Sequence, residues 1–273
     1  MSEYLESVQR LTRDLRNASV TLSAREARFL VDAYYAMQRD RIRAGHQERK
    51  LEEGAEPNTI MGWLADQRGT LEKQIARALD AYSGAHPVGI WARSIVGIGP
   101  IITAGLLAHL DIKQAPTVGH FWRIAGLDPT SAWKEGEKRP WNGSLKRLCW
   151  LIGESFTKVS NNENDVYGKI YRERKDLEVS RNEAGLFADQ AAASLSKKNW
   201  RADTATRKHY ESGKLPPARI QLRAQRYAVK LFLAHLHHVM FVLEFSEQPP
   251  KPYILTRPDH AHFIAPPNWP MAA

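Results

Sequence analysis

The chain has 273 residues, which is long enough for one large domain or two small ones with a proper hydrophobic core. Its single cysteine, Cys149, excludes an internal disulfide and a cysteine zinc site, and its apolar surroundings predict a structural core thiol. The formal net charge of +9 favours a polyanionic partner.

The sequence contains no signal for a membrane. No basic stretch followed by an apolar one stands at the start, and no run of 18 apolar residues occurs anywhere. We therefore expect a soluble, cytoplasmic protein that makes no contact with a membrane.

Apolar residues at three- and four-residue steps run through the N-terminal third. They predict a helix over 3–16, a longer helix that Ser23 caps and, after the polar turn 53–58, a third helix over 60–82. This pattern is typical of an antiparallel pair or bundle with charged outer faces. The alternating runs of a nuclease sheet do not occur here, so we interpret the aspartates of this region as solvated helix-face charges.

The stretch 94–104 predicts a helix that ends in a glycine turn and restarts at once as a second helix. Gly97 and Gly99 can take a positive φ, and Ile98 between them is expected to anchor the turn in the core. Pro100 suits the first turn of the second helix, whose free N–H groups would face a phosphate. We interpret 91–110 as a helix-hairpin-helix motif, and the alternative is an ordinary helix-loop-helix corner with glycine caps.

The stretch 126–142 is irregular and rich in tryptophan, glycine and cations. A short helix over 117–124, capped by Thr117, precedes it, and a helix that starts at Asn142 or Ser144 follows it. Trp122, Trp133, Trp141 and Trp150 surround this loop. Packing is the default interpretation of these rings, and Trp133 and Trp141 are the candidates for stacking on unpaired bases.

The C-terminal part is predicted to be helical and then extended. Helices are expected over 166–197, 205–211 and 217–245, and the tail 248–273, with seven of the 15 prolines, is expected to be an extended arm. Between 197 and 230 the chain has ten basic and two acidic residues, a local net charge of +8. We predict an all-α protein of four segments with bounds 1–86, 87–160, 161–246 and 247–273.

The order of motifs from 94 to 159 is more specific than any single motif: the glycine turn, a helix, Gly126-Leu127-Asp128-Pro129, a basic loop and a further helix. This segment, about a quarter of the chain, resembles the C-terminal domain of insertion-sequence transposases of the bridge-RNA-guided, serine-using kind. The resemblance implies DNA binding and kinship with recombination enzymes.

Two features depart from that family. Its members carry an N-terminal RuvC-like domain with acidic residues on a sheet, whereas the N-terminal third here is predicted to be helical. They also place an attacking serine a few residues after the Ala-Gly-Leu-x-Pro motif, where this chain has Trp133 or Lys134. Ser131 and Ser144 stand nearby, and the plainer interpretation makes Ser131 a turn residue and Ser144 a helix cap.

Candidate catalytic residues are Ser144 and Glu154, an acid in an otherwise apolar helix. Glu154 would act as a base or metal ligand, and the alternative is an ion pair with Arg123 or Lys158. We expect no cofactor, and Mg²⁺ only if the chain is catalytic.

Histidines gather late in the chain, at His235, His237 and His238 and at His260 and His262 of the tail. His235 and His238 share a helix face and, with His209 or a tail histidine, could hold a divalent metal. Because zinc sites usually show paired spacing, core or helix-interface histidines are the default interpretation, and we predict no metal site.

These features together predict a DNA-binding protein, with RNA as the other candidate nucleic acid, that holds the phosphate backbone without reading bases. The predicted contacts come from the glycine turn, the basic loop and the helices after it: Gly97, Ile98, Gly99, Thr103, Lys134, Lys138, Arg139, Trp141, Lys146, Arg147, Arg219, Arg223 and Arg226. One alternative is an active transposase, recombinase or metal-dependent nuclease. The other is an assembly component of a phage or mobile element, whose long helices and C-terminal arm would hold a homo-oligomer.

Overall fold

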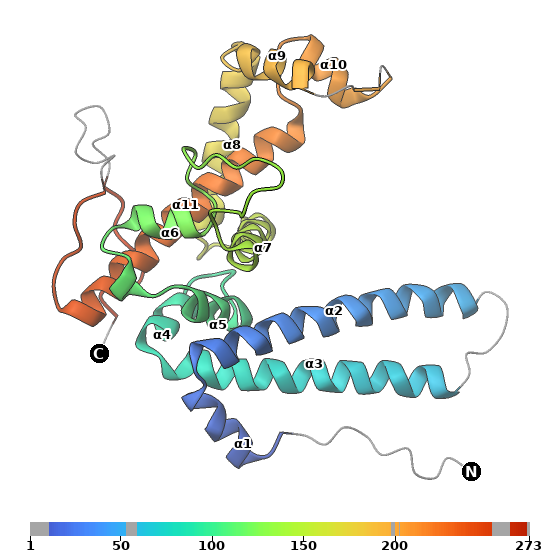
Figure 1. Cartoon of the computed structure of the whole chain (residues 1–273), viewed down its shortest axis with the longest axis vertical. Coiled ribbons are helices and arrows are strands. Elements are labelled where there is room, and N and C mark those ends of the chain that lie inside the picture. Colours follow the sequence, from blue (N-terminus) through green and yellow to red (C-terminus); the bar gives the residue numbers. More distant parts are fainter. Residues whose placement is uncertain (1–10, 53–58, 198–199, 202, 253–262, 272–273) are drawn as a thin grey trace. The chain divides into compact units, whose positions relative to one another are not determined.

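A computed structural model describes residues 11–52, 59–197, 200–201, 203–252 and 263–271. These residues form helices joined by loops, without a strand among them, which confirms the all-α prediction (Figure 1). Two short 3-10 helices, η1 (Ser19–Thr21) and η2 (Ile112–Gln114), accompany the α-helices. In chain order the α-helices are α1 (Arg13–Ala18), α2 (Ala24–Glu52), α3 (Thr59–Ala85), α4 (Pro87–Arg93), α5 (Pro100–His109), α6 (Val118–Ile124), α7 (Gly143–Val159), α8 (Tyr167–Glu183), α9 (Ala188–Lys197), α10 (Ala205–Glu211) and α11 (Pro217–Phe245).

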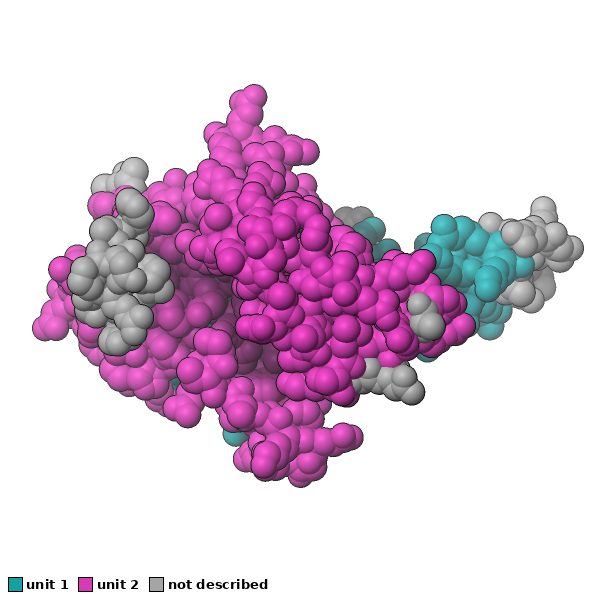
Figure 2. Space-filling view, turned by 90° about the horizontal axis from the view of Figure 1, so that it is seen from above, with its two compact units in different colours: residues 1–93, 99–111 teal, residues 94–98, 112–273 magenta. Residues whose placement is uncertain are grey.

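The chain divides into two compact units (Figure 2). Unit 1 comprises 1–93 and 99–111, and unit 2 comprises 94–98 and 112–273. The predicted segment 87–160 is therefore split between them. The physical reason is packing: α4 and α5 contact α3, whereas the short stretch 94–98 belongs with the helices of unit 2.

Unit 1 is built on α2 and α3, which run antiparallel beside each other (Figure 1). As predicted, Ser23 caps the long helix: its Oγ accepts from the N–H of Glu26 at 3.3 Å, and the Glu26 carboxylate accepts from the N–H of Ser23 at 2.8 Å. Ala104 and Ala108 of α5 pack into the core that α2 and α3 share. A third helix thus completes the core of the predicted pair.

The helix predicted over 3–16 lies partly outside the described residues, which begin at 11. Within them, Thr12 caps α1 by accepting from the N–H of Leu15 at 3.3 Å. A helix is therefore present in this region, but its described part starts and ends later than predicted.

The long helix α11 is central to unit 2 and packs against α6, α7 and α8. The ring centroid of Phe232 in α11 lies 5.7 Å from that of Phe156 in α7 and 5.3 Å from that of Tyr167 in α8. All three side chains are fully buried. By length and composition α11 could cross a membrane, but the core helix of a soluble protein passes the same test, and half of its most apolar window is buried.

The helix predicted over 166–197 is two helices, which corrects that prediction. Gly185 takes a φ of +76°, and its N–H bonds to the carbonyl of Asn182 at 3.1 Å, so the glycine ends α8. The chain then turns into α9, which packs on α10 around the buried Ala191 and Tyr210. The last two helices, α10 and α11, begin and end at the predicted residues.

Two of the three histidines of α11, His235 and His237, lie in the core, and His238 is half-buried. His235 is 4% exposed, with Nδ1 2.7 Å from the Tyr167 hydroxyl and Nε2 2.8 Å from the carbonyl of Ile264. Because only an N–H can bind a carbonyl, Nε2 donates to Ile264. Burial lowers the pKa of His235 to about 4. His237 likewise donates from Nε2 to the carbonyl of Ala115 at 2.8 Å.

Candidate nucleic-acid interface

The basic loop between α6 and α7 is anchored at both ends. Gly126 takes a φ of +65°, and a Cβ there would lie 2.9 Å from Cγ of Trp141 and 3.0 Å from Cδ of Lys146. A glycine is therefore needed for these two side chains to pack on the loop. At the other end, Asn142 donates its N–H to the carbonyl of Ile124 at 2.8 Å and caps α7 with its side chain. The predicted helix start at Asn142 is thus confirmed.

Cations and tryptophan rings alternate along this loop. Cζ of Arg139 lies 5.2 Å from the ring centroid of Trp133, and Trp133 meets Trp141 edge-on with centroids 6.3 Å apart. Nζ of Lys146 lies 4.0 Å from the ring centroid of Trp141. Cation–π contacts of this kind contribute about 0.5–1 kcal/mol at exposed sites, and they leave the positive charge in place.

The helix α11 extends the same cluster. Nζ of Lys230 lies 4.1 Å from the ring centroid of Trp122, whose Nε1 donates to the Lys230 carbonyl at 3.1 Å. Burial lowers the pKa of Lys146 and of Lys230, and the positive charge of Arg226 lowers both further. The charge of Arg226 thus acts on cations of both α7 and α11, and residues far apart in the sequence form one cluster of charges.

We call this cluster the cationic patch; its members are Arg139, Lys146, Arg226 and Lys230 with Trp122, Trp133 and Trp141. Within the described part of the chain, none of its four cations forms an ion pair. Asp128 forms no ion pair with Lys230, but its negative charge raises the pKa of Lys230 and offsets part of the larger lowering by burial. Burial and the charges of Arg219 and Arg223 lower the pKa of Arg226. Clustered positive charges that form no ion pair attract an anion.

The glycine turn is packed into the protein. Gly97 takes a φ of +91°, its carbonyl accepts from Oγ of Ser155 at 2.6 Å, and a Cβ there would lie 3.1 Å from Cγ2 of Val159. Ile98 is 4% exposed, which confirms its predicted role as an anchor. Gly99, by contrast, has a φ of −91°, so it does not take the positive φ that we expected.

Thr103 cannot offer its side chain to a phosphate, which corrects its place among the predicted contacts. It is 1% exposed, and its hydroxyl donates to the carbonyl of Gly99 at 3.0 Å. Pro100 stands in the first turn of α5, as predicted. The order helix, glycine turn and helix is thus present, and its binding to a phosphate stays a prediction.

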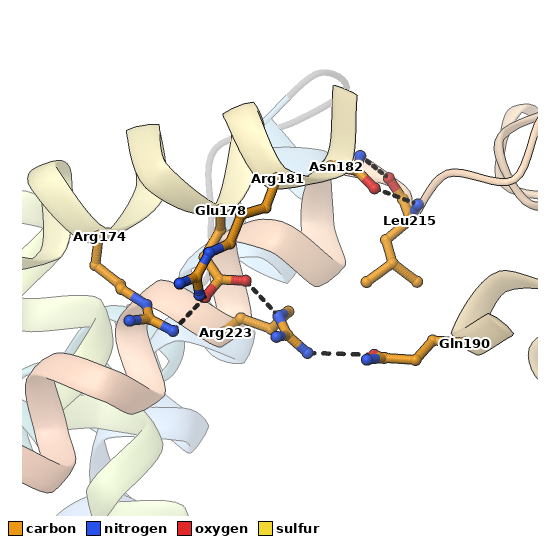
Figure 3. Close-up of polar contacts among 7 residues, drawn as sticks. All are labelled: Arg174, Glu178, Arg181, Asn182, Gln190, Leu215 and Arg223. Atoms are coloured by element: carbon orange, nitrogen blue, oxygen red, sulfur yellow. Dashed lines mark hydrogen bonds and ion pairs between the residues drawn. The ribbon is translucent and has the colours of Figure 1, made fainter. Parts of the chain in front are cut away.

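Arg223 is occupied by the protein itself (Figure 3). Its Nε donates to the carboxylate of Glu178 at 2.7 Å, its NH1 donates to Oε1 of Gln190 at 3.2 Å, and its guanidinium lies 4.4 Å from the ring centroid of Phe187. We therefore assign Arg223 to the packing of α11 on α8 and α9. Its charge still reaches Arg226.

The four remaining predicted cations are exposed. Lys134 and Lys138 are exposed in the loop, Arg147 is exposed on α7, and Arg219 is exposed on α11. Burial has the largest effect on the pKa of Arg226, and the positive charge of Arg219 lowers that pKa further. The charge of Arg219 therefore acts on the patch. The contact of these four residues with a phosphate stays a prediction.

The two candidate catalytic residues lie far apart. Ten residues of one helix separate Ser144 from Glu154, a rise of about 15 Å, whereas a nucleophile and its base must lie within hydrogen-bond reach. Glu154 accepts from Nε2 of Gln225 at 2.8 Å, rather than pairing with a cation. Ser144 is the second residue of α7, so Asn142 and not Ser144 is the helix cap. Ser131 bonds back to Asp128 in a turn, as predicted.

The structure places the remaining candidates for chemistry in the core. Cys149 is 2% exposed and burial raises its pKa to about 12, which confirms a structural thiol. Among the residues that the structure describes, no three histidine, cysteine or acidic side chains are grouped as a metal site. His260 and His262 lie outside those residues.

Sequence reasoning missed one residue of the patch and the exposure of one tryptophan on α7. Lys230 follows Arg219, Arg223 and Arg226 at helical spacing, so the periodicity of α11 could have identified it. Trp150 was expected to be packing, yet it is 51% exposed on α7 and is more open than Trp133, which is 37% exposed. No local pattern distinguishes an exposed tryptophan from a buried one, because the neighbouring helices decide it.

Comparison of the chain with protein-family models, with curated proteins and with solved structures finds no match.

Proposed function

We propose that the chain binds nucleic acid, with DNA as the expected form, through phosphate contacts of the cationic patch. The observation that carries the proposal is the set of four cations, Arg139, Lys146, Arg226 and Lys230, which form no ion pair among the described residues. Tryptophan rings hold three of them, and the charge of Arg226 acts on Lys146 and Lys230. Arg and Lys form charge-assisted hydrogen bonds with phosphate oxygens, and a phosphate relieves the repulsion among them. The resemblance to transposase C-terminal domains points the same way.

Binding of this kind is largely independent of sequence, because phosphates carry no base identity. It depends steeply on salt, because each neutralised phosphate releases condensed counterions. For duplex DNA the logarithm of the affinity falls with the logarithm of salt by about 0.9 per contact, so four contacts give a slope of about −3.6.

The test is a titration of labelled DNA with the purified protein, read by fluorescence anisotropy. The variant Lys146→Gln/Arg226→Gln removes two patch charges from two different helices, and we expect a loss of affinity of at least tenfold. The matched control is Lys208→Gln, an exposed lysine of the same basic segment but outside the patch. Equal affinity of the wild type and the double variant would refute the proposal.

A further inference from the structure

We infer that the patch prefers single-stranded nucleic acid, with an unpaired base stacked on Trp133; this inference rests on the proposed function. Two of the three rings in the patch are already covered. Nζ of Lys230 lies 4.1 Å from the centroid of Trp122, and Nζ of Lys146 lies 4.0 Å from that of Trp141. Trp133 is the exposed ring of the three, at 37%, and its cation, Arg139, lies farther away at 5.2 Å.

The ring of Trp133 is held in a fixed orientation. Its Nε1 donates to the carbonyl of Glu137 at 2.7 Å, within the same loop. The Glu137 carboxylate accepts from the N–H of Lys134 at 3.3 Å, and the edge of Trp141 supports the ring from the side. A side chain that is already ordered loses little entropy when a ligand binds. Trp133 is thus preorganised as a platform rather than a mobile surface residue.

The neighbours of Trp133 match a nucleotide and not only a base. Arg139 on the ring and Lys146 on the adjoining Trp141 place cations beside the platform, where the phosphates of a stacked nucleotide lie. In a duplex the faces of the bases are covered by their neighbours, whereas a single strand offers a free face at every base. A ring flanked by cations therefore selects strands with unpaired bases.

The experiment compares four ligands of equal length: a thymine single strand, a single strand of abasic sites, a duplex and an RNA single strand. The abasic strand keeps the phosphates and lacks the bases. For the wild type we expect the thymine strand to bind about tenfold more tightly than the abasic strand, the size of one stacking contact. Trp133→Ala should abolish this ratio, Trp133→Phe should restore most of it, and affinity for the abasic strand should not change.

Trp150→Ala is the matched control, because Trp150 is 51% exposed and, among the described residues, no ring or cation–π contact joins it to the patch. It should leave the ratio unchanged. A wild-type ratio near one would overturn the stacking inference and leave the proposed function intact. If none of the four ligands binds, or if their binding does not depend on salt, the proposed function itself is overturned. Stronger binding of the RNA strand than of the thymine strand, with the same loss in Trp133→Ala, would support stacking and assign RNA as the ligand.

Discussion

Glu178 is the residue whose removal should destabilise unit 2 most clearly. It is fully buried on α8, and three arginines surround its carboxylate: Arg174 at 2.5 Å, Arg223 at 2.7 Å and Arg181 at 3.8 Å (Figure 3). Burial raises the pKa of Glu178, but the hydrogen bond from Arg223 and the nearby charges outweigh it and hold the pKa below its ordinary value. The variant Glu178→Gln keeps the shape and removes the charge.

The expected loss follows from the exposure of the partners. Breaking a buried ion pair costs about 3–5 kcal/mol, because the remaining charge stays without a partner. The arginine side chains here are 25% to 42% exposed, so water screens part of their charge and the lower end applies, about 3 kcal/mol. For a unit of this size that is a fall in Tm of about 6–12 °C.

The assay is urea unfolding of the full chain, followed by circular dichroism. Glu211→Gln is the control, since Glu211 pairs with Arg207 at the surface and should lose less than about 1 kcal/mol. The stabilisation by Glu178 is complete above its ordinary pKa of 4.5 and disappears as the pH falls through the lower pKa of the folded state. A loss in Glu178→Gln no larger than that in the control would refute this reasoning.

Two further predictions concern the glycine turn and the core histidine. Gly97→Ala should lower the free energy of unfolding by about 2 kcal/mol, because Gly97 has a φ of +91° and close contacts around its Cα. Gly99→Ala should change the free energy of unfolding by about 1 kcal/mol or less. Equal losses for the two variants in urea unfolding would contradict this prediction. The free energy of unfolding should fall by about 3 kcal/mol as the pH falls from 6.5 to 4, because unfolded His235 takes up a proton that the folded ring, with a pKa of about 4, resists. His235→Gln should flatten that part of the pH profile, and an unchanged profile would contradict it.

Local signals predicted most of the helices. Ser23, Asn142 and Pro217 stand at the starts of their helices because capping groups and proline act within a few residues of the chain. Gly97, Gly126 and Gly185 mark backbone positions with positive φ for the same local reason. The break at Gly185 within a periodic stretch was missed, because a periodic helical pattern tolerates a single glycine.

The candidate site was predicted as parts and not as a whole. Lys146 and Arg226 are 80 positions apart, and nothing local indicates that the charge of Arg226 acts on Lys146. The same limit explains why Arg223 and Thr103 were included among the contacts. Only tertiary packing shows that Arg223 pairs with Glu178 and that Thr103 is buried.

The central claim, that the cationic patch neutralises phosphates, is tested most directly by the salt dependence of duplex binding. The affinity of the wild type, of Lys146→Gln/Arg226→Gln and of Lys208→Gln would be measured from low to physiological salt. We predict that the double variant lowers the slope of the logarithmic plot by about 1.8, for two lost contacts, and that Lys208→Gln leaves it unchanged. Equal slopes for all three proteins would contradict the account.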